Sequence, residues 1–257
     1  MRLLGNGLLP QIVGDDGSGG AASPLDVAGC VLWLDGSDTS SLFVDAGTTP
    51  VSVDSDVIYQ WNDKSGEGNH AVQSSATSRP AYRTAVQNGL AVSRFDGSND
   101  SMIIPQPVTV DTATFCIFLV SKANDATTER IPFHVGVGAN GMGIAQYTWT
   151  TGRKGFLLGG VAWVEPFIPA DTGWHLWLLR RSGGTATLYD SGIPIVDTAS
   201  EPVTPTTQTS LGDYNGSAPA ACDIAEAIVH ENISVASVNL LGNYLASKWD
   251  IAWTDIV

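Results

Sequence analysis

The feature that most constrains the fold is a series of short apolar or alternating runs, each about as long as a β-strand. The runs are rich in β-branched and aromatic residues, which favour strands, and they include GCVLWLD, VIYQW, VSRFD, ATFCIFLVSK, RIPFHVGV, HLWLLRR, ATLYD and CDIAEAIVH. Turn-forming sequences such as DGS, SGEGN, DGSND and SGG separate them. Because helices do not alternate with these strands, the pattern predicts an all-β protein, a sandwich or barrel rather than a parallel α/β sheet.

Size and composition fit one such domain. The 257 residues are about the upper size of a single all-β domain, and 43% of them are hydrophobic, which is enough to form a core. The 26 acidic residues against 12 basic ones give a net charge of −14. Phosphate backbones and anionic membrane surfaces repel a chain this acidic, so we expect no nucleic-acid binding. The longest apolar runs are too short to span a bilayer, so we expect no membrane insertion.

Three cysteines, Cys30, Cys116 and Cys222, lie far apart in apolar stretches. This pattern is typical of buried free thiols rather than of a disulfide framework, and it predicts folding in a reducing cytoplasm. The first residues do not form a typical secretion signal, because glycine, asparagine and proline interrupt the apolar centre. We therefore expect the protein to be made in a cytoplasm without cleavage of a leader.

Residues 1–22 do not follow the strand pattern. Apolar residues occur there in short groups that match neither the helix nor the strand period, namely Leu3, Leu4, Leu8, Leu9, Ile12 and Val13. The sequence GDDGSGGAAS follows them and has the composition of a flexible linker. We predict an extended arm that is held by the body of the domain or, as we favour, by a different chain. The division expected is an anchoring arm over 1–22 and one domain over 23–257.

A helix is predicted near the C-terminus. Apolar residues recur there at spacings of three and four, at Val235, Val238, Leu241, Leu245 and Trp249. Ser234 or Ser237 is the candidate N-cap. We expect this helix to cover one end of the sandwich.

Several longer motifs carry a family resemblance. They are VLWLDGSDTSSLF at 31–43, VIYQWNDKSGEGNHAVQ at 57–73, GWHLWLLRRSGGTATLYDSG at 173–192 and DIAEAIVHENISVASVNLLGNYLASKWD at 223–250. In this order the chain resembles the laminin-G-like (concanavalin A-like) jelly-roll domains of bacteriophage structural and bacterial surface proteins. The resemblance implies two antiparallel sheets packed face to face with a covering C-terminal helix, and it does not itself imply a ligand. The hairpin YDSG departs from the VNG or VDG of many relatives.

Metal binding has one weak candidate. Asp96, Asn99 and Asp100 place oxygen atoms close together, as a calcium loop would. The alternative is a tight turn that uses Asp and Gly chemistry, which we favour. The four histidines do not have zinc-ligand spacing. We expect no cofactor, with calcium as the open alternative.

Glycan hydrolysis requires two carboxylates that face one cleft. The best candidate is the strand at 223–231, where strict alternation puts Asp223 on one face and Glu226 on the other. We therefore expect no catalytic site and no enzyme.

Two tryptophans are candidates for sugar binding. Trp149 and Trp163 lie beside turn or polar residues, and exposed aromatic rings stack well on sugar rings. Ordinary packing or a subunit contact is the rival explanation, and we favour it. In contrast, Trp33, Trp61 and Trp249 belong to the family motifs and are expected in the core.

The resemblance, the free thiols and the apolar arm lead to one functional hypothesis. It is a non-enzymatic bacteriophage virion surface protein, a capsid decoration, head-fibre or tail-fibre component, attached to other virion proteins through its arm. The alternative is a carbohydrate-binding adhesion module of a phage or bacterial surface, and a glycan-degrading enzyme is the third class. Host-surface glycans are the expected small partners, and we expect a homo-oligomer.

Overall fold

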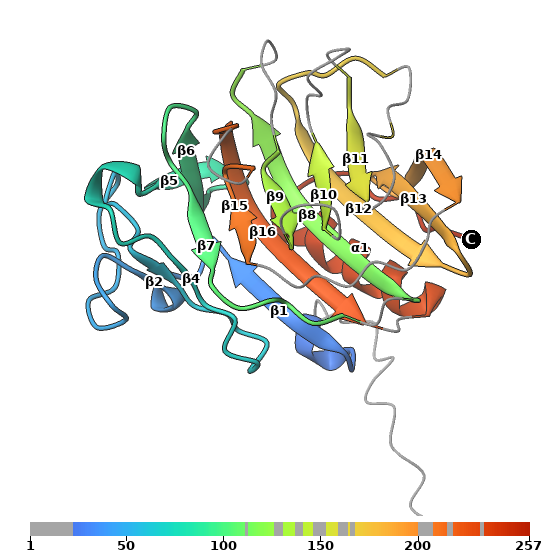
Figure 1. The fold of residues 1–257 in the computed structure, drawn as a ribbon, viewed down its shortest axis with the longest axis horizontal. Helices are drawn as coiled ribbons and strands as arrows, with labels where there is room; N and C mark the ends of the chain where they lie inside the picture. The colour runs from blue at the N-terminus through green and yellow to red at the C-terminus, as the bar shows by residue number, and fades with distance from the viewer. Residues whose placement is uncertain are drawn as a thin grey trace, which may run out of the picture.

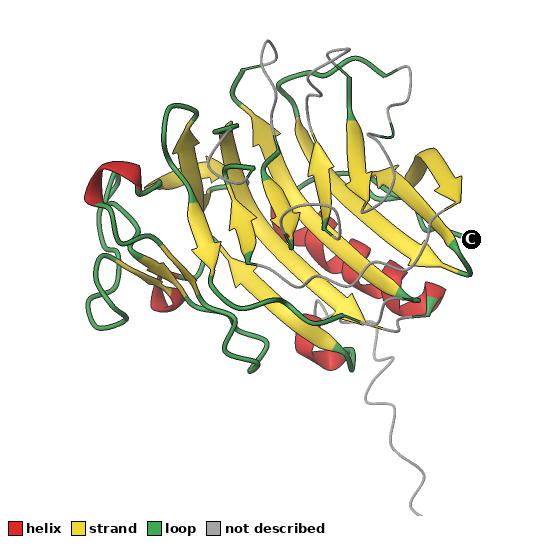
Figure 2. Ribbon diagram, in the orientation of Figure 1, coloured by secondary structure: helices red, strands yellow, loops and turns green. Residues whose placement is uncertain are grey.

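A computed structural model gives the fold, and it describes residues 23–110, 113–125, 131–136, 141–145, 153–158, 164, 168–199, 208–214, 218–231 and 234–257. The molecule is mostly β-strand, with two antiparallel sheets of eight strands each and one C-terminal α-helix (Figures 1 and 2). The predicted all-β antiparallel sandwich with a C-terminal helix is therefore confirmed. The arm over 1–22 lies outside the described residues.

The first sheet, sheet A, has the order β14-β13-β12-β8-β16-β6-β5, and β1 also pairs with β16. Its strands are β1 (Cys30–Asp35), β5 (Ala81–Gln87), β6 (Leu90–Asp96), β8 (Phe115–Ala123), β12 (Trp174–Ser182), β13 (Thr185–Asp190), β14 (Ile193–Ala199) and β16 (Ala221–Glu231). One edge of β16 pairs with β8 along its length, whereas β6 and β1 share the other edge.

The second sheet, sheet B, has the order β11-β10-β9-β15-β7-β4-β3-β2. Its strands are shorter: β2 (Leu42–Phe43), β3 (Gln60–Trp61), β4 (Ala71–Val72), β7 (Met102–Ile104), β9 (Phe133–Val135), β10 (Met142–Ala145), β11 (Gly155–Leu158) and β15 (Thr209–Leu211). Three short 3₁₀ turns lie at Pro24–Asp26, Thr39–Ser41 and Ala76–Ser78.

Sheet A is buried on both faces, and β8 shows why. Phe115, Ile117 and Leu119 point to the core between the two sheets, which we call the inner face of sheet A. The alternate residues Cys116 and Phe118 belong to a second core on the other side, the outer face. An uninterrupted apolar run such as FCIFLV is what burial on two faces requires, because alternate side chains point in opposite directions.

Helix α1 (Val235–Trp249) covers the outer face. Ser234 is its N-cap, and the Ser234 side chain accepts a hydrogen bond from Ser237 N. The predicted apolar stripe is buried at Val238, Leu241, Leu245 and Trp249. The expectation that the helix covers an end of the sandwich is wrong, because Figure 1 shows α1 lying against the sheet of β8 and β16, on the side away from β9 and β10.

After α1 the chain turns back along the helix. Asp250 ends the helix in the left-handed conformation, with a φ of 52°. Residues 251–257, the C-terminal segment, then run back beside α1 to the edge of sheet A, where the C label lies near β13 and β14 in Figure 1. A Cβ atom on Gly242 would lie 2.1 Å from the Trp253 ring, so the absence of a side chain at Gly242 lets Trp253 pack directly on the helix.

The alternation predicted for the strand at 223–231 is also wrong. A β-bulge interrupts the register of β16 between Ile224 and Glu226. The extra residue reverses the alternation, so Asp223 and Glu226 both lie on the outer face instead of on opposite faces. A single inserted residue has no signal of its own in the sequence.

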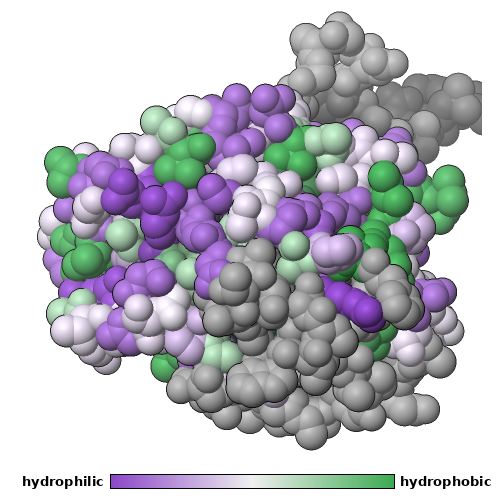
Figure 3. Space-filling view, turned by 90° about the horizontal axis from the view of Figure 1, so that it is seen from above, coloured by the Kyte–Doolittle hydropathy of each residue, from purple (hydrophilic) through white to green (hydrophobic). Residues whose placement is uncertain are grey.

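The described tryptophans and thiols match their predictions in the main. Trp33, Trp61 and Trp249 are buried, as are Cys116 and Cys222, whereas Cys30 is half-buried. Within the described ranges, no helix has the length and apolar character needed to cross a membrane. The described residues visible in Figure 3 are largely hydrophilic, with small hydrophobic patches between them.

Candidate functional site

The motifs that carry the family resemblance meet in a buried polar network under α1. The Glu226 carboxylate accepts hydrogen bonds from Trp33 Nε1 and Trp249 Nε1, both at 2.7 Å, and from Tyr244 Oη at 3.0 Å. Lys248 Nζ lies 2.7 Å from Glu226 Oε2. Burial raises the pKa of Glu226, and the Lys248 ammonium opposes this effect. Because its hydrogen-bonding capacity is used within the fold, Glu226 joins the helix to sheet A rather than facing a substrate.

The same network reaches the molecular surface through a second carboxylate. Asp35 contacts both Lys248 Nζ, at 2.7 Å, and Lys64 Nζ, at 3.1 Å. Lys64 also pairs with Asp38 at 2.7 Å. The pKa of Asp35 is lowered, since these ammonium groups outweigh the effect of burial. These motif residues therefore explain the fold, and the functional site must be sought elsewhere.

A second charged cluster joins the two sheets. Lys154, just before β11 of sheet B, lies 3.0 Å from Asp171 Oδ2 and 3.2 Å from Asp190 Oδ2. His175 on β12 of sheet A contacts the same two carboxylates, through Nε2 to Asp171 and through Nδ1 to Asp190, each at 2.8 Å. Both imidazole nitrogens are thus engaged inside the cluster. The arrangement fits a polar cross-link between the sheets better than a catalytic base.

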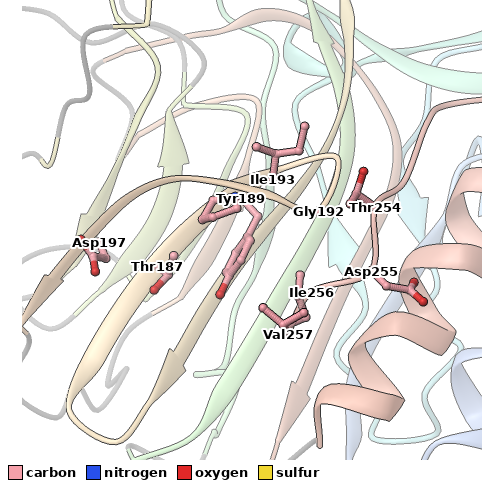
Figure 4. A pocket seen from close by; sticks show the side chains of 10 residues that line it. Thr187, Tyr189, Gly192, Ile193, Asp197, Thr254, Asp255, Ile256 and Val257 are labelled. Carbon is pink, nitrogen blue, oxygen red and sulfur yellow. The ribbon is translucent and has the colours of Figure 1, made fainter.

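A pocket of about 500 Å³ lies at the edge of sheet A (Figure 4). Its walls are the β13–β14 hairpin and the C-terminal segment, through Thr187, Tyr189, Gly192, Ile193, Pro194, Asp197, Thr254, Asp255, Ile256 and Val257. We refer to it below as the hairpin pocket. Its volume falls in the range of pockets that hold small ligands.

The hairpin turn brings the C-terminal segment into place. Ser191 and Gly192 have φ values of 54° and 80°, as a two-residue turn with the twist of a β-hairpin requires. A Cβ atom on Gly192 would lie 1.7 Å from the Thr254 carbonyl oxygen, so only glycine permits this approach. Thr254 N donates to Ser191 O at 2.9 Å. The turn sequence YDSG is therefore part of the pocket wall.

Helix α1 fixes the other wall. Ile256 N donates to Asn239 Oδ1 at 2.8 Å, and Asn239 Nδ2 donates back to Ile256 O at 3.0 Å. Asn243 Nδ2 donates to Asp255 Oδ1 at 2.9 Å, and Figure 4 shows the Asp255 side chain directed toward the helix. The pocket therefore depends on one asparagine pair on the exposed side of α1.

The lining joins an aromatic ring to polar groups without protein partners. Thr187 and Tyr189 alternate on β13 and share a face, and Asp197 on β14 is the cross-strand partner of Thr187. Figure 4 shows Ile256 and Val257 beside the Tyr189 ring. Among the described residues, the side-chain oxygens of Thr187, Tyr189 and Asp197 have no hydrogen-bond partner. These groups are free to bind a ligand that has an apolar face and several hydroxyls.

The predicted site residues are distributed differently. The anchoring residues Leu3, Leu4, Leu8, Leu9, Ile12 and Val13 and the two platform residues Trp149 and Trp163 all lie outside the described residues. Their roles remain predictions.

The calcium candidates form a turn. The Asp96 carboxylate accepts the backbone N–H of Ser98 at 2.7 Å, and Asn99 Nδ2 donates to Thr77 O at 2.8 Å. Asp100 Oδ2 accepts Asp96 N at 2.9 Å, and burial raises the pKa of Asp100 to about 6. Within the described part of the chain, no group of three His, Cys, Asp or Glu residues is arranged to hold a metal ion.

Sequence reasoning missed the hairpin pocket. Its residues come from two segments, 187–197 and 251–257, that only the folded hairpin and helix bring together. The one available signal was the departure of YDSG from the usual hairpin sequence, which marks this turn as different. The pocket residues themselves are common residue types in unremarkable strand positions.

The chain matches no protein-family model, and no curated protein matches it in sequence. Solved structures do share its fold. Domain 4 of an extracellular GH43 arabinanase from Geobacillus stearothermophilus, in complex with arabinotriose, aligns over 82% of this chain and 98% of its own length, at 14% identity and a TM-score of 0.60. An arabinofuranosidase complexed with arabinofuranosyl-alpha-1,2-xylobiose aligns over 86% of this chain and 63% of its own, at 12% identity and a TM-score of 0.62.

A third similar structure is the sialidase of Trypanosoma rangeli, which aligns over 87% of this chain at 11% identity and a TM-score of 0.52. The aligned part is 34% of the sialidase, so this chain spans about a third of that enzyme. At these identities the likeness shows the fold. It is a β-sandwich that occurs in glycoside hydrolases.

These matches correct two expectations. The hypothesis of a non-enzymatic bacteriophage virion surface protein is wrong, because the structures that share the sandwich belong to glycoside hydrolases. The expectation that the chain is not an enzyme is contradicted by the same matches. The free thiols and the apolar arm, on which the virion hypothesis rested, do not report on ligand chemistry.

Proposed function

We propose that this chain is a carbohydrate-binding domain with a laminin-G-like (concanavalin A-like) sandwich, and that it binds a neutral sugar unit in the hairpin pocket. The observation that carries the proposal is the pairing of the Tyr189 ring with the unpartnered oxygens of Thr187 and Asp197 on one face. Sugar rings have an apolar C–H face that packs on aromatic rings and hydroxyls that pair with such oxygens.

The charge of the pocket supports a neutral ligand. Asp197 and Asp255 line it, and its lining includes no lysine or arginine. A carboxylate-bearing sugar would therefore meet like charge without a compensating cation. The Asp197 carboxylate is instead suited to accept hydrogen bonds from two hydroxyls of a neutral sugar.

The comparison with the arabinanase domain adds a substrate class. That domain matches this chain over nearly its whole length and was solved with arabinotriose, and the arabinofuranosidase was solved with an arabinofuranosyl-xylobiose. Pentose oligosaccharides are therefore the first ligands to test.

The test is calorimetric titration of the full chain with arabinotriose and xylobiose. We expect a dissociation constant on the order of 0.1–1 mM, because one aromatic contact and a few hydrogen bonds must offset the loss of ligand freedom. Tyr189→Ala should weaken binding about tenfold or more, and Asp197→Asn by a similar factor. Tyr59→Ala is the matched control, since Tyr59 packs under Arg79 beside β3, at the far edge of sheet B.

Two results would overturn the proposal. One is the absence of saturable binding to either sugar, or binding that Tyr189→Ala and Tyr59→Ala weaken equally. The other is release of reducing ends that stops in Asp197→Asn, which would make hydrolysis rather than binding the function of the pocket.

A further inference from the structure

A row of four side chains crosses sheet A away from the hairpin pocket. Trp174 on β12 pairs with Lys122 on β8, Lys122 pairs with Asp223 on β16, and Asp223 pairs with Arg94 on β6. Directly paired residues project from the same face of a sheet. Trp174 packs against the outer-face core, so the whole row lies on the outer face. We call these four residues the outer row.

One end of the outer row is rigid. Arg94 holds the buried Asp223 through two parallel bonds, Nε to Oδ1 at 2.6 Å and Nη2 to Oδ2 at 2.7 Å. Asn124 Nδ2 also donates to Asp223 Oδ1, at 3.0 Å. This bidentate geometry fixes the guanidinium plane and satisfies the buried carboxylate. The Arg94 side chain remains about one-third exposed.

The cation in the middle of the row is unpaired. Of the four lysines in the chain, Lys64, Lys154 and Lys248 each contact two carboxylates. Among the described residues, the Lys122 ammonium has no carboxylate within ion-pair distance and lies 6.0 Å from the centre of the Trp174 ring. In a chain with a net charge of −14, an unpaired lysine held beside an aromatic ring is unusual.

The row borders a hollow. A cavity of about 420 Å³ is lined by Arg94, Phe95, Asp96, Lys122, Asn124 and Ala221. Asp96 uses its carboxylate to accept backbone N–H groups of its own turn, including Ser98 N at 2.7 Å. The groups left for a ligand are therefore the Lys122 ammonium, the exposed part of Arg94 and the Asn124 amide. Lys122 and Arg94 are donors, whereas the Asn124 amide, whose nitrogen already donates to Asp223 Oδ1, also offers an acceptor oxygen.

We propose that the outer row is a second glycan-binding site, selective for a sugar that carries a carboxylate. The carboxylate would pair with Lys122 and the exposed edge of Arg94, and the sugar ring would lie against Trp174. Lys122 and Arg94 balance Asp223 and Asp96, so this place is neutral overall, whereas the hairpin pocket has carboxylates and no cation in its lining. Because Arg94 holds Asp223 and backbone N–H groups hold Asp96, the Lys122 ammonium is the charge available to a ligand carboxylate. This site is separate from the hairpin pocket and does not depend on the function proposed for it.

The test compares sialyllactose with lactose, which differ by the acidic sugar. Binding to the full chain is followed by NMR through the Trp174 indole N–H and the Asn124 side-chain amide. We expect sialyllactose to shift both signals and lactose to shift neither. Lys122→Gln and Trp174→Ala should each weaken sialyllactose binding about tenfold or more, because each removes one of the two main contacts.

Arg180→Gln is the matched control, since it removes one positive charge from β12 at the position paired with Cys116, six residues along β8 from Lys122 and so about 20 Å away. It should leave binding within about twofold of the unmodified chain, because surface charges separated by more than a Debye length are screened. Tyr189→Ala should also leave sialyllactose binding intact, which separates this site from the hairpin pocket. Equal shifts with lactose, or a Lys122→Gln variant that binds as tightly as Arg180→Gln, would overturn the proposal.

Discussion

Glu226 shows how much of the fold can depend on one side chain. It is buried and ionisable, and donors from two elements hold it on β16: Trp33 on β1, and Tyr244, Lys248 and Trp249 on α1. Such a group is stable inside a protein only while its partners stay in place. Two of the motif tryptophans, Trp33 and Trp249, are therefore in the core for a second reason besides their size, because each supplies an indole N–H to the same carboxylate.

Glu226→Gln tests this role. The amide has the same shape, but its NH₂ group would face donors that have lost their acceptor, and Lys248 would lose one of its two carboxylates. We expect the free energy of unfolding to fall by about 2–4 kcal/mol in urea denaturation. Glu231→Gln, at the half-buried end of the same strand, should change it by less than about 0.5 kcal/mol. Equal effects of the two variants would contradict the prediction.

At the scale of elements, α1 and the C-terminal segment act as one unit. The helix buries its apolar stripe on sheet A, and one flank of the helix holds residues 251–257 through Asn239, Asn243 and Gly242. The hairpin pocket exists only while this segment is docked. The stability of the hairpin pocket is therefore linked to Gly242, a helix residue that does not line the pocket.

Gly242→Ala distinguishes intrinsic helix propensity from packing. Alanine favours an exposed helix by about 1 kcal/mol over glycine, but here the new Cβ would overlap the Trp253 ring. We expect net destabilisation of about 1–3 kcal/mol, faster hydrogen exchange over 251–257 and weaker sugar binding in the pocket. Ser247→Ala, on the exposed side of α1, should show none of these effects. A Gly242→Ala protein as stable as the unmodified chain would show that packing of Trp253 on Gly242 does not stabilise the fold.

Periodicity made most elements predictable. The stripe from Val235 to Trp249 specifies a helix and its cap, because burial along one side imposes a spacing of three and four. The strands are predictable because burial of one or both faces of a sheet imposes an alternating or a continuous apolar pattern. The run FCIFLV also indicates that sheet A is covered on both faces, which is inconsistent with a helix at an end of the sandwich.

The pocket and the outer row were beyond sequence reasoning. Trp174, Lys122, Asp223 and Arg94 become neighbours only through the pairing order of four strands, and the bulge at Ala225 decides which face Glu226 occupies. Strand order is set by the packing of the whole core and not by any local pattern. Sites assembled across a sheet are therefore the least visible part of a β-sandwich sequence.

For the molecule as a whole, the buried histidines set the response to acid. His134 is fully buried, its ring nitrogens have no hydrogen-bond partner among the described residues, and burial lowers its pKa to about 4. Burial also lowers the pKa of His230 to about 4. In the unfolded chain both would have a pKa of about 6.5 and would bind protons first. The histidine contribution to stability should thus be complete above about pH 6.5 and fall as the pH decreases to 4. The raised pKa of Asp100, about 6, has the opposite sign and offsets part of this loss below pH 6.

Urea unfolding at a series of pH values measures how the free energy of unfolding changes with pH. Each histidine lowers the free energy of unfolding by up to about 3 kcal/mol between pH 6.5 and 4. Carboxylates with a lowered pKa, such as Asp35 and Asp190, reduce the free energy of unfolding only at lower pH. His134→Phe should reduce the loss between pH 6.5 and 4 by up to about 3 kcal/mol, the contribution of that one histidine. An unchanged slope in that variant would show that His134 is not responsible.

The position of β16 has a consequence for how the protein is made. This strand joins β8 on one side to β6 and β1 on the other, and it follows all three in the chain. Until the ribosome has released residues 221–231, sheet A consists of separate pieces with unpaired, strongly apolar edges. The nascent chain must therefore wait, exposed to aggregation and to chaperones, for its last strand.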